Sequence, residues 1–576
     1  MLQIKNLRVE FETEQGTQVA LHDISFNVNP GEIVAVVGES GSGKSVTALS
    51  VLQLLPSKTV RYTNGHILFS ATAAPPIDLL TAKGSTLRAI RGNQIAMIFQ
   101  EPMTSLNPVL TCGNQVMEAV TLHTSLTEEA ARQQTLSLFE KVKLPHPEIV
   151  FNRYPHQLSG GQKQRVMIAM AMSGNPSLLI CDEPTTALDV TVQQTILQLI
   201  KTLQQATGMG VIFITHDLGV VAEIADRVVV MYRGNIVEEG PAKALMLHPR
   251  HPYTMGLLAC RPILHTKGQR LPVVSDFMEG KQSALTQKPM STSHAGHPAQ
   301  INEKAIPAVS DPVLGEKLIE VSNLAVWFPG KKNFLGKVSG YTRAVDDISF
   351  DVYTGETLGL VGESGCGKTT LGRTLLRLVE PTGGKIRYRG NDLGAYSGTA
   401  LRRLRKDIQI IFQDPYSALN PSITIGNAIQ EVLQVHKILS SSAARKERVM
   451  ELLNKVSLQP EHFYRYPHEF SGGQRQRIVI ARALALSPSF IVCDESVSAL
   501  DVSVQAQVLN LLTDLKKEFR FTIIFISHDL SVVHYISDRI MVMRKGKIVE
   551  TGSAEQIYHH PRESYTQGLI AAIPGQ

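Results

Sequence analysis

The octet Gly38-Glu39-Ser40-Gly41-Ser42-Gly43-Lys44-Ser45 decides the fold of the first half of the chain. It fits the pattern G-x-x-x-x-G-K-[ST], follows the apolar run Ile33–Val37, and precedes residues 46–54, which have helical character. A strand, a glycine-rich loop and a helix in this order are the context in which the pattern binds phosphate. Glycines let the backbone approach a phosphate closely, while loop N–H groups and the helix N-terminus supply positive potential.

The second half of the chain repeats the first. An octet of the same pattern ends in Lys368-Thr369, and this lysine lies 324 residues after Lys44. Gln100 and Gln413 lie 313 residues apart, so the first half carries 11 extra residues between its lysine and this glutamine, and residues 71–76 are expected to belong to this insertion. Later landmarks keep a constant separation of 312 residues. A glycine-rich turn before a buried helix arises by chance, but two copies in matched context predict two phosphate-binding domains.

Both octets are expected to bind nucleotide phosphates through every residue of the loop. The two lysines are expected to reach the β- and γ-phosphates, and Ser45 and Thr369 to hold Mg²⁺. The second loop consists of Gly362, Glu363, Ser364, Gly365, Cys366, Gly367, Lys368 and Thr369.

Acidic residues follow an apolar strand in each half. Asp182-Glu183 and Asp494-Glu495 end such strands, and His216 and His528 each lie 33 residues beyond the glutamate. An aspartate at a strand's carboxyl end can sit by Mg²⁺, and the next glutamate can polarise a water for attack on the γ-phosphate. Two acids at a strand end, or a histidine after a strand, are usually structural; a preceding phosphate loop favours the catalytic interpretation. The histidines can orient the attacking water.

A Ser-Gly-Gly turn before a helix-forming stretch adds a second candidate anion site to each half. These turns are Ser159-Gly160-Gly161-Gln162 and Ser471-Gly472-Gly473-Gln474. With them, the chain resembles a fused pair of ATP-binding-cassette (ABC) ATPase domains over nearly its whole length. The resemblance implies an α/β fold of two tandem P-loop NTPase domains, each with a mixed sheet core, a helical subdomain and an antiparallel β subdomain.

The resemblance also implies roles for individual residues. Gln100 and Gln413 would be the Q-loop glutamines, which contact nucleotide and Mg²⁺, and residues 186–189 and 498–501 would be the D-loops. The two domains would pair head to tail, so that Ser471 completes the ATP site of Lys44 and Ser159 that of Lys368. For the aromatic residue that stacks on adenine, the candidates are Phe11 and Phe328, with Tyr341 as a rival; a core role is equally open for these side chains.

The residues after each Q-loop glutamine resemble the branch that imports oligopeptides, dipeptides, glutathione and nickel complexes. They read Glu101-Pro102-Met103-Thr104-Ser105-Leu106-Asn107-Pro108 and Asp414-Pro415-Tyr416-Ser417-Ala418-Leu419-Asn420-Pro421. Residues 251–254 and 564–566, near the ends of the halves, agree with this branch.

The branch implies two integral-membrane permeases as partners, docking near Ser105, Leu106, Ala418 and Leu419, and a secreted or periplasmic solute-binding protein. For the two leucines a core role is equally open. The chain departs from the pattern in having only Cys260 where many members carry a cysteine-rich tail. No iron–sulfur cluster is therefore expected.

Composition is compatible with this interpretation. The net charge of +6 is mild and suits an anionic membrane face without demanding nucleic acid, and no apolar run approaches the ~18 residues that span a bilayer. Five scattered cysteines fit a reduced cytosol. We therefore expect a peripheral protein on the cytoplasmic face of the bacterial inner membrane, with no nucleic-acid partner. The alternative is a double cassette acting on ribosomes or DNA.

The expected organisation is a first domain at residues 1–266, a flexible linker at 267–316 and a second domain at 317–576. The linker is polar, contains Pro, Ser and His, and lacks periodicity. Its close pair His294 and His297 is interpreted as part of a solvated tether because no further metal ligands lie nearby.

Overall fold

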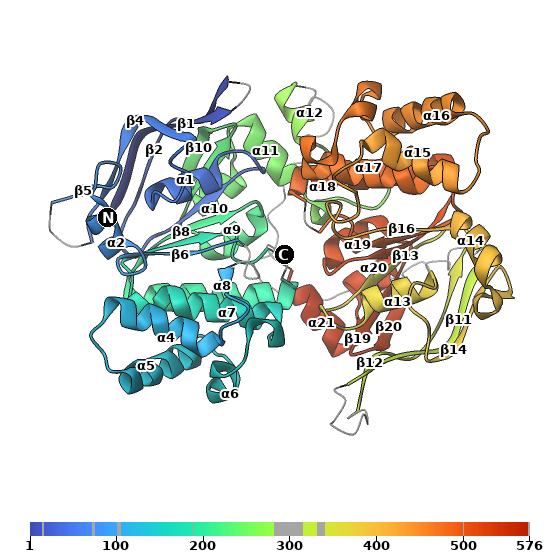
Figure 1. Ribbon diagram of the computed structural model, residues 1–576, viewed down its shortest axis with the longest axis horizontal. Helices are drawn as coiled ribbons and strands as arrows, with labels where there is room; N and C mark the ends of the chain where they lie inside the picture. Colours follow the sequence, from blue (N-terminus) through green and yellow to red (C-terminus); the bar gives the residue numbers. More distant parts are fainter. Residues whose placement is uncertain are drawn as a thin grey trace, which may run out of the picture. The chain divides into compact units, whose positions relative to one another are not determined.

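The computed structural model describes residues 1–13, 16–71, 75–100, 105–186, 188–280, 315–330, 340–498 and 500–573. The chain divides into two units, unit 1 mainly residues 1–259 and unit 2 mainly residues 260–573, and Figure 1 shows the elements of each. Some predictions fall outside the described residues: part of the insertion (72–74), part of the stretch after Gln100 (101–104), one residue of each D-loop (187 and 499), and most of the linker (281–314), with its two histidines.

Unit 1 contains two sheets. An antiparallel sheet has the order β2-β1-β4-β5, and a six-stranded sheet has the order β10-β9-β3-β8-β7-β6, parallel except for β10. The strands are β1 (Leu2–Thr13), β2 (Gly16–Val28), β3 (Ile33–Val37), β4 (Val60–Phe69), β5 (Ile77–Asp78), β6 (Ile95–Ile98), β7 (Leu178–Asp182), β8 (Gly210–Thr215), β9 (Arg227–Tyr232) and β10 (Asn235–Pro241).

Some helices of unit 1 pack on its six-stranded sheet, and others pack on one another in a separate helical subdomain. In Figure 1, α4, α5 and α7 lie together as a helical subdomain. The helices are α1 (Lys44–Val51), α2 (Gly84–Ile90), α4 (Cys112–His123), α5 (Glu128–Lys141), α6 (Pro147–Phe151), α7 (Gly160–Ala171), α8 (Val190–Thr207), α9 (Leu218–Ile224), α10 (Ala242–Leu247) and α11 (Pro252–Ala259).

Unit 2 repeats both sheets, with the orders β12-β11-β14-β15 and β16-β17-β18-β13-β19-β20. Its strands are β11 (Lys317–Pro329), β12 (Tyr341–Tyr353), β13 (Thr357–Val361), β14 (Gly383–Tyr388), β15 (Asn391–Asp392), β16 (Ile408–Ile411), β17 (Phe490–Asp494), β18 (Thr522–Ile526), β19 (Arg539–Arg544) and β20 (Lys547–Ser553). Its helices are α12 (Val274–Met278), α13 (Lys368–Leu375), α14 (Gly398–Asp407), α15 (Ile425–Val435), α16 (Ser442–Lys455), α17 (Gly472–Leu484), α18 (Val502–Phe519), α19 (Leu530–Ile536), α20 (Ala554–His559) and α21 (Ser564–Ala571). The predicted fold class is confirmed.

Burial explains why the central strands read as continuous apolar runs. Every residue of β3, β7 and β8 is buried, and the same holds for β13, β17 and β18. Parallel strands covered on both faces need apolar side chains on both, which removes the alternation seen in β1. Because β3 and β7 run parallel two places apart in the sheet, the phosphate loop and Asp182 come out at the same edge.

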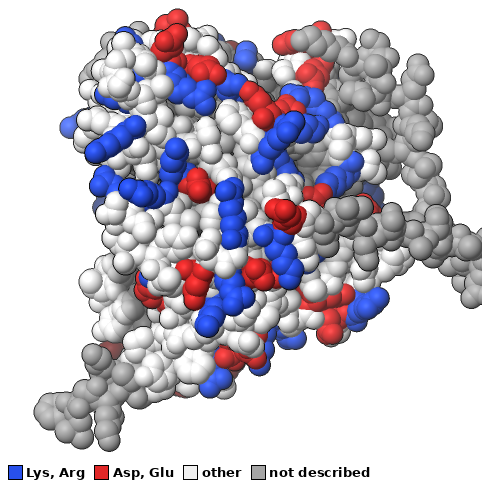
Figure 2. All heavy atoms as spheres, turned by 90° about the vertical axis from the view of Figure 1, so that its right-hand side faces the viewer, with Lys and Arg blue, Asp and Glu red and all other residues white. Residues whose placement is uncertain are grey.

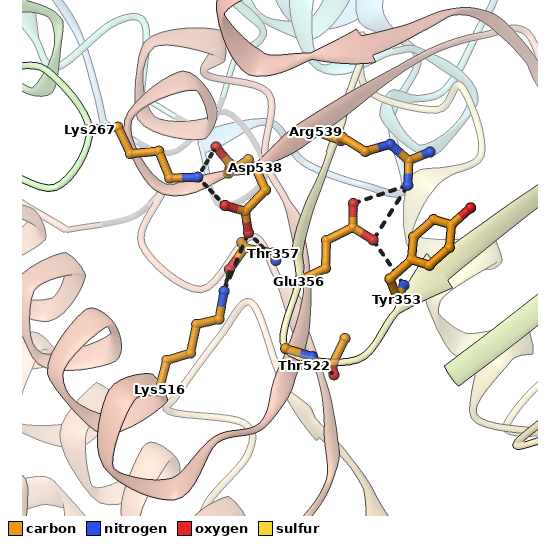
Figure 3. A network of polar contacts seen from close by, with 10 residues as sticks. Lys267, Tyr353, Glu356, Thr357, Lys516, Thr522, Asp538 and Arg539 are labelled. Atoms are coloured by element: carbon orange, nitrogen blue, oxygen red, sulfur yellow. Dashed lines mark hydrogen bonds and ion pairs between the residues drawn. The ribbon is translucent and has the colours of Figure 1, made fainter. Parts of the chain in front are cut away.

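Residues 267–280, which we expected to begin the flexible linker, pack on unit 2 instead. Lys267 Nζ donates to the backbone oxygen of Ser537 at 2.7 Å and pairs with the carboxylate of Asp538, as Figure 3 shows. Leu271 is 1% exposed and exchanges two hydrogen bonds, of 2.9 and 2.8 Å, with the Asn510 side chain. We call residues 267–271 the docking segment. Its partners lie 239 or more residues away in sequence, so no local sequence pattern predicts that this segment is well ordered.

Candidate functional site

Each phosphate loop curls around its own lysine. The Nζ atom of Lys44 donates to the backbone oxygens of Gly38 and Glu39 at 2.8 and 3.0 Å. In unit 2, Lys368 Nζ donates to the backbone oxygens of Gly362 and Glu363 at 2.6 and 3.0 Å. Glycine is required before the second lysine, because Gly367 has a φ of 112° and a Cβ there would lie 2.0 Å from a backbone oxygen. The loops thus place an ammonium group at the start of α1 and α13, as phosphate binding needs.

A hydroxyl and an aspartate meet beside each loop. Ser45 Oγ lies 3.0 Å from Asp182 Oδ1, and Thr369 Oγ1 lies 2.9 Å from Asp494 Oδ1. Burial raises the pKa of Asp182 to about 6, against the hydrogen bond from Ser45, and burial also raises the pKa of Asp494. A buried carboxylate beside a hydroxyl is a hard oxygen pair of the kind that Mg²⁺ prefers.

The glutamate after each aspartate binds the predicted glutamine and histidine. Glu183 Oε2 accepts a hydrogen bond from Gln100 Nε2 at 3.2 Å and lies 3.2 Å from His216 Nδ1. Burial alone would raise the pKa of Glu183, but the hydrogen bond and charge of His216 outweigh it and hold the pKa at about 2. In return, Glu183 raises the pKa of His216 against the effect of burial. Glu183 is therefore an anion at neutral pH, able to accept a hydrogen bond from water.

Unit 2 reproduces this cluster with a looser histidine. Gln413 Nε2 donates to Glu495 Oε2 at 2.8 Å, and His528 Nδ1 lies 3.7 Å from the same oxygen. The pKa of Glu495 is lowered because His528 outweighs burial. Glu183 and Glu495 have φ values of 46° and 47°, in the left-handed region, which is uncommon for a residue with a side chain. Backbone strain of this kind clusters at functional sites.

A cavity of about 230 Å³ joins the predicted residues of unit 2. Its lining includes the loop, the Q-loop glutamine and the glutamate, so residues from three separate sequence motifs share one space. The residues are Ala344, Ser364, Gly365, Gly367, Lys368, Thr369, Thr370, Gln413 and Glu495.

The signature serines cap helices. Ser159 Oγ accepts from the backbone N–H of Gln162 at the start of α7, and the Gln162 side chain accepts from Ser159 N at 3.1 Å. Ser471 and Gln474 form the same capping box on α17. Each box lies at an exposed serine and begins a helix of 12 or 13 residues, and an accessible helix N-terminus suits an anion.

The sequence did not predict that a tyrosine hydroxyl hydrogen-bonds the backbone of each phosphate loop. The hydroxyl oxygen of Tyr253 accepts a hydrogen bond from the backbone N–H of Glu39 at 2.9 Å, and Tyr565 accepts from Glu363 at 3.2 Å. Tyr253 is fully buried, and burial raises the pKa of Tyr565 to about 12. Both tyrosines lie in stretches that resemble the importer branch, but only the fold shows what they contact. Thr186, whose hydroxyl donates to Glu183 Oε2 at 2.9 Å, was also missed as a partner of the glutamate.

The remaining candidate residues, for permease contact and for adenine stacking, differ in how exposed their side chains are. Leu106 and Leu419 are 2% and 3% exposed, which favours the core alternative for these two positions, whereas Ser105 is exposed. Among the adenine-stacking candidates, Phe328 and Tyr341 are 43% and 60% exposed, while Phe11 packs partly against the core of unit 1. None of the helices in the described ranges is long and apolar enough to cross a membrane.

Two family models match both halves of the chain. One, described as ABC transporter, matches residues 21–186 and 345–498, and the other, described as oligopeptide/dipeptide transporter, C-terminal region, matches residues 237–284 and 549–575. The glutathione import ATP-binding protein GsiA of Pectobacterium atrosepticum is 48% identical over 100% of this chain and 89% of its own length. GsiA of Escherichia coli K12 is similar at the same identity and coverage. A solved dimeric ATP-binding cassette, MJ0796 bound to ADP and Pi, aligns with 42% of this chain and 99% of its own at 29% identity and a TM-score of 0.38.

Proposed function

The chain belongs to the ABC transporter family as an ATP-binding, ATP-hydrolysing subunit of an importer, and from this premise we propose how its sites work and what it transports. The observation that carries the proposal is the gathering of lysine, hydroxyl–aspartate pair, glutamine, glutamate and histidine around a phosphate loop in each unit. Neither unit has lost one of these groups, so both sites are proposed to hydrolyse ATP.

Mg²⁺ is proposed as the cofactor of both sites. Ser45 with Asp182, and Thr369 with Asp494, offer oxygen donors at hydrogen-bond distance. Gln100 and Gln413, each bonded through Nε2 to the neighbouring glutamate, are proposed to add their side-chain oxygens to each set. When bound, the ion neutralises charge on the β- and γ-phosphate oxygens. The protein's share is to hold the triphosphate: the lysine and the loop N–H groups bind the phosphates.

The glutamates are proposed to act on the attacking water. Glu183 accepts its proton as the water oxygen bonds to the γ-phosphorus and the bond from that phosphorus to the bridging oxygen breaks, giving ADP and phosphate. His216 orients the water and steadies Glu183 through their contact. Glu495 and His528 have the same roles in unit 2.

The two sites are proposed to be composite. The signature turn at Ser471 would complete the site of Lys44, and the turn at Ser159 that of Lys368, with the units head to tail. Capped, outward-facing helix N-termini support this because such a terminus stabilises phosphate only within about one turn. ATP would close the pair, and hydrolysis would reopen it.

Glutathione or a similar small peptide is the proposed solute. Two relatives with 48% identity over the whole chain are named glutathione import proteins. The proposed partners are two permeases, contacted near Ser105 and Ala418, and an extracytoplasmic binding protein, which places the chain peripherally on the cytoplasmic membrane face. On the face of the molecule in Figure 2, lysines and arginines lie among aspartates and glutamates, unlike the continuous basic surface typical of nucleic-acid binding.

Reconstitution tests the proposal. The chain would be assembled in liposomes with the permeases encoded beside it, and uptake of labelled glutathione and of a labelled dipeptide would be followed with the binding protein outside and ATP inside. We expect ATP-dependent uptake that disappears when both glutamates are replaced by glutamine. The findings do not support the ribosome or DNA alternative. Failure of ATP to drive uptake of either solute would refute the proposed solute class.

A further inference from the structure

Two histidines and a glutamate meet in unit 2 away from the phosphate loop. His534 comes from α19, while Glu555 and His559 come from α20, four residues apart and therefore on one face of that helix. One ligand atom from each side chain lies within 4.8 Å of the other two. Imidazole nitrogens and a carboxylate oxygen are the donors that Zn²⁺ and its neighbours in the first transition row take from proteins.

The separations match those around a metal ion. His534 Nε2 lies 3.3 Å from Glu555 Oε1, and His559 Nε2 lies 3.4 Å from Glu555 Oε2. Ligands bound at about 2.0–2.2 Å in a tetrahedron are about 3.4 Å apart, so each histidine nitrogen already lies at such a distance from one oxygen of Glu555. The three ligand atoms lie within 4.8 Å of one another, so side-chain movement alone can bring them onto one ion.

His534 faces Glu555 from a buried position. Its Nε2 atom is shielded from solvent and lies 3.3 Å from Glu555 Oε1, within ion-pair distance but without the geometry of a hydrogen bond, and only 12% of its side-chain surface is exposed. A shielded polar atom whose contact is this poorly formed calls for an explanation. The ring is held by stacking on Tyr558, with centroids 4.2 Å apart and planes 17° apart. A metal ion would use the shielded nitrogen on a ring that is already oriented.

The other two side chains open the cluster to solvent. The side chains of Glu555 and His559 are 62% and 55% exposed. An ion can therefore enter from that side, and a water can occupy the fourth position of a tetrahedral site.

Unit 1 has the same helices without the ligands. At the constant separation of 312 residues, His534, Glu555 and His559 correspond to Ala222, Lys243 and Leu247. These positions lie on α9 and α10. The fold therefore does not require the cluster, and one unit serves as an internal reference for the other.

We propose that His534, Glu555 and His559 form a Zn²⁺-binding site specific to unit 2. The ion joins α20 to α19, the helix that begins two residues after the catalytic-site histidine His528. Ordinary histidine–glutamate ion pairs are the competing explanation; they predict no metal affinity, so binding separates the two.

The test is a Zn²⁺ titration of the full-length chain, stripped with a chelator and kept free of nucleotide, in competition with a chromophoric indicator. We expect one equivalent that Glu555→Gln and His559→Gln each weaken by at least about 100-fold, more than the loss typical of a residue that only supports a ligand. His560→Gln is the matched control, because it changes the next residue and removes no ligand. With Co²⁺ in place of Zn²⁺, Glu555→Gln and His559→Gln should abolish the visible absorption of a tetrahedral site.

Two results would overturn the proposal: no Zn²⁺ bound by the unmodified chain, or an equivalent whose affinity is unchanged in His559→Gln. Both test positions are largely exposed, so the variants are expected to fold, and unfolding curves without metal check this. Zn²⁺ that binds at the phosphate-loop clusters would still bind to these variants, so it can be distinguished from Zn²⁺ at the proposed site.

Discussion

Three side chains converge on one oxygen of Glu183, those of Gln100, Thr186 and His216. At Glu495 the glutamine lies at a comparable distance, but the histidine is at 3.7 Å, and the hydroxyl of Ser498 donates to the glutamate's backbone oxygen rather than its side chain. At the scale of single residues the two sites therefore differ, although their motifs read alike.

Replacing both glutamates separates binding from turnover. Glu183→Gln with Glu495→Gln should keep ATP affinity and lower steady-state hydrolysis by about 10²–10⁴-fold, because only the proton acceptor is lost. Lys44→Ala and Lys368→Ala should weaken affinity as well. Hydrolysis assays and nucleotide titrations make the comparison, and undiminished turnover in the double glutamine variant would refute the assignment.

The tyrosines behind the phosphate loops give a second test. Tyr253→Phe and Tyr565→Phe remove the acceptor for a loop N–H, at about 0.5–1.5 kcal/mol for a typical hydrogen bond, so nucleotide affinity at the changed site should fall roughly two- to tenfold. Tyr535→Phe is the control: its hydroxyl donates to the backbone oxygen of Gln269 in the docking segment. It should lower thermal stability and leave affinity unchanged. Equal affinity losses in all three variants would show a general effect of stability.

At the scale of elements, the sequence predicts the cluster because parallel strands end at one sheet edge. β3 and β7 are recognisable as apolar runs, so the loop after β3 must lie beside the acidic pair at the end of β7. The tyrosines could not be predicted this way, since α11 and α21 carry them back to the loop along a path set by tertiary packing. For Leu106 and Leu419 the sequence left a contact role and a core role open, because a motif position alone cannot distinguish them, and their burial favours the core.

The capped helices test the head-to-tail proposal. Ser471→Arg places a bulky side chain at the N-terminus of α17, so it should reduce nucleotide trapping at the Lys44 site before the Lys368 site, and Ser159→Arg should do the reverse. Vanadate trapping of a photoreactive ATP analogue, followed by cleavage between residues 281 and 314, shows which half carries label. Loss of label from the half that contains the substituted serine, with the other half spared, would contradict the proposal.

At the scale of the whole molecule, the duplication and the fold class were predictable and the docking segment was not. Lys267 and Arg270 look like solvated charges in a polar stretch, yet each pairs with an aspartate of unit 2 more than 240 residues away. Polar composition indicates a linker when local sequence is the only guide. Long-range pairs of this kind leave no periodicity to detect.

The Lys267–Asp538 pair should make stability depend on pH. Burial raises the pKa of Asp538, but the hydrogen bond and charge of Lys267, together with the charge of Lys516 and the hydrogen bond from the Thr357 N–H, outweigh it and leave the pKa below its ordinary value. The stabilisation is therefore fully present above an unfolded pKa of about 3.9 and is lost as pH falls through the lower folded value. Lys267→Met should destabilise the protein at pH 7 by no more than about 1 kcal/mol, because both side chains are over a third exposed. Denaturant unfolding should show this deficit at pH 7 and a smaller one below pH ~4; a deficit independent of pH would exclude the pair as its cause.

Splitting the chain tests where unit 2 begins. Co-expressed residues 1–290 and 299–576 should yield a stable pair, because the first fragment keeps the docking segment. Residues 1–258 with 299–576 should leave the second fragment less stable, since burial of a leucine such as Leu271 contributes about 1.5–3 kcal/mol. Thermal unfolding of the two pairs decides, and equal stability would show that the segment is dispensable.

The docking segment also sets an order of events on the ribosome. Leu271 leaves the exit tunnel 239 residues before Asn510, its hydrogen-bond partner. At about 5–20 residues per second this is a delay of about 10–50 s. For that interval the nascent chain carries a finished first cassette followed by an apolar side chain that has nothing to pack against, and unit 2 can close only when its last third is made. A nascent chain that stalls or is truncated before Asn510 would therefore leave this segment available to chaperones and proteases.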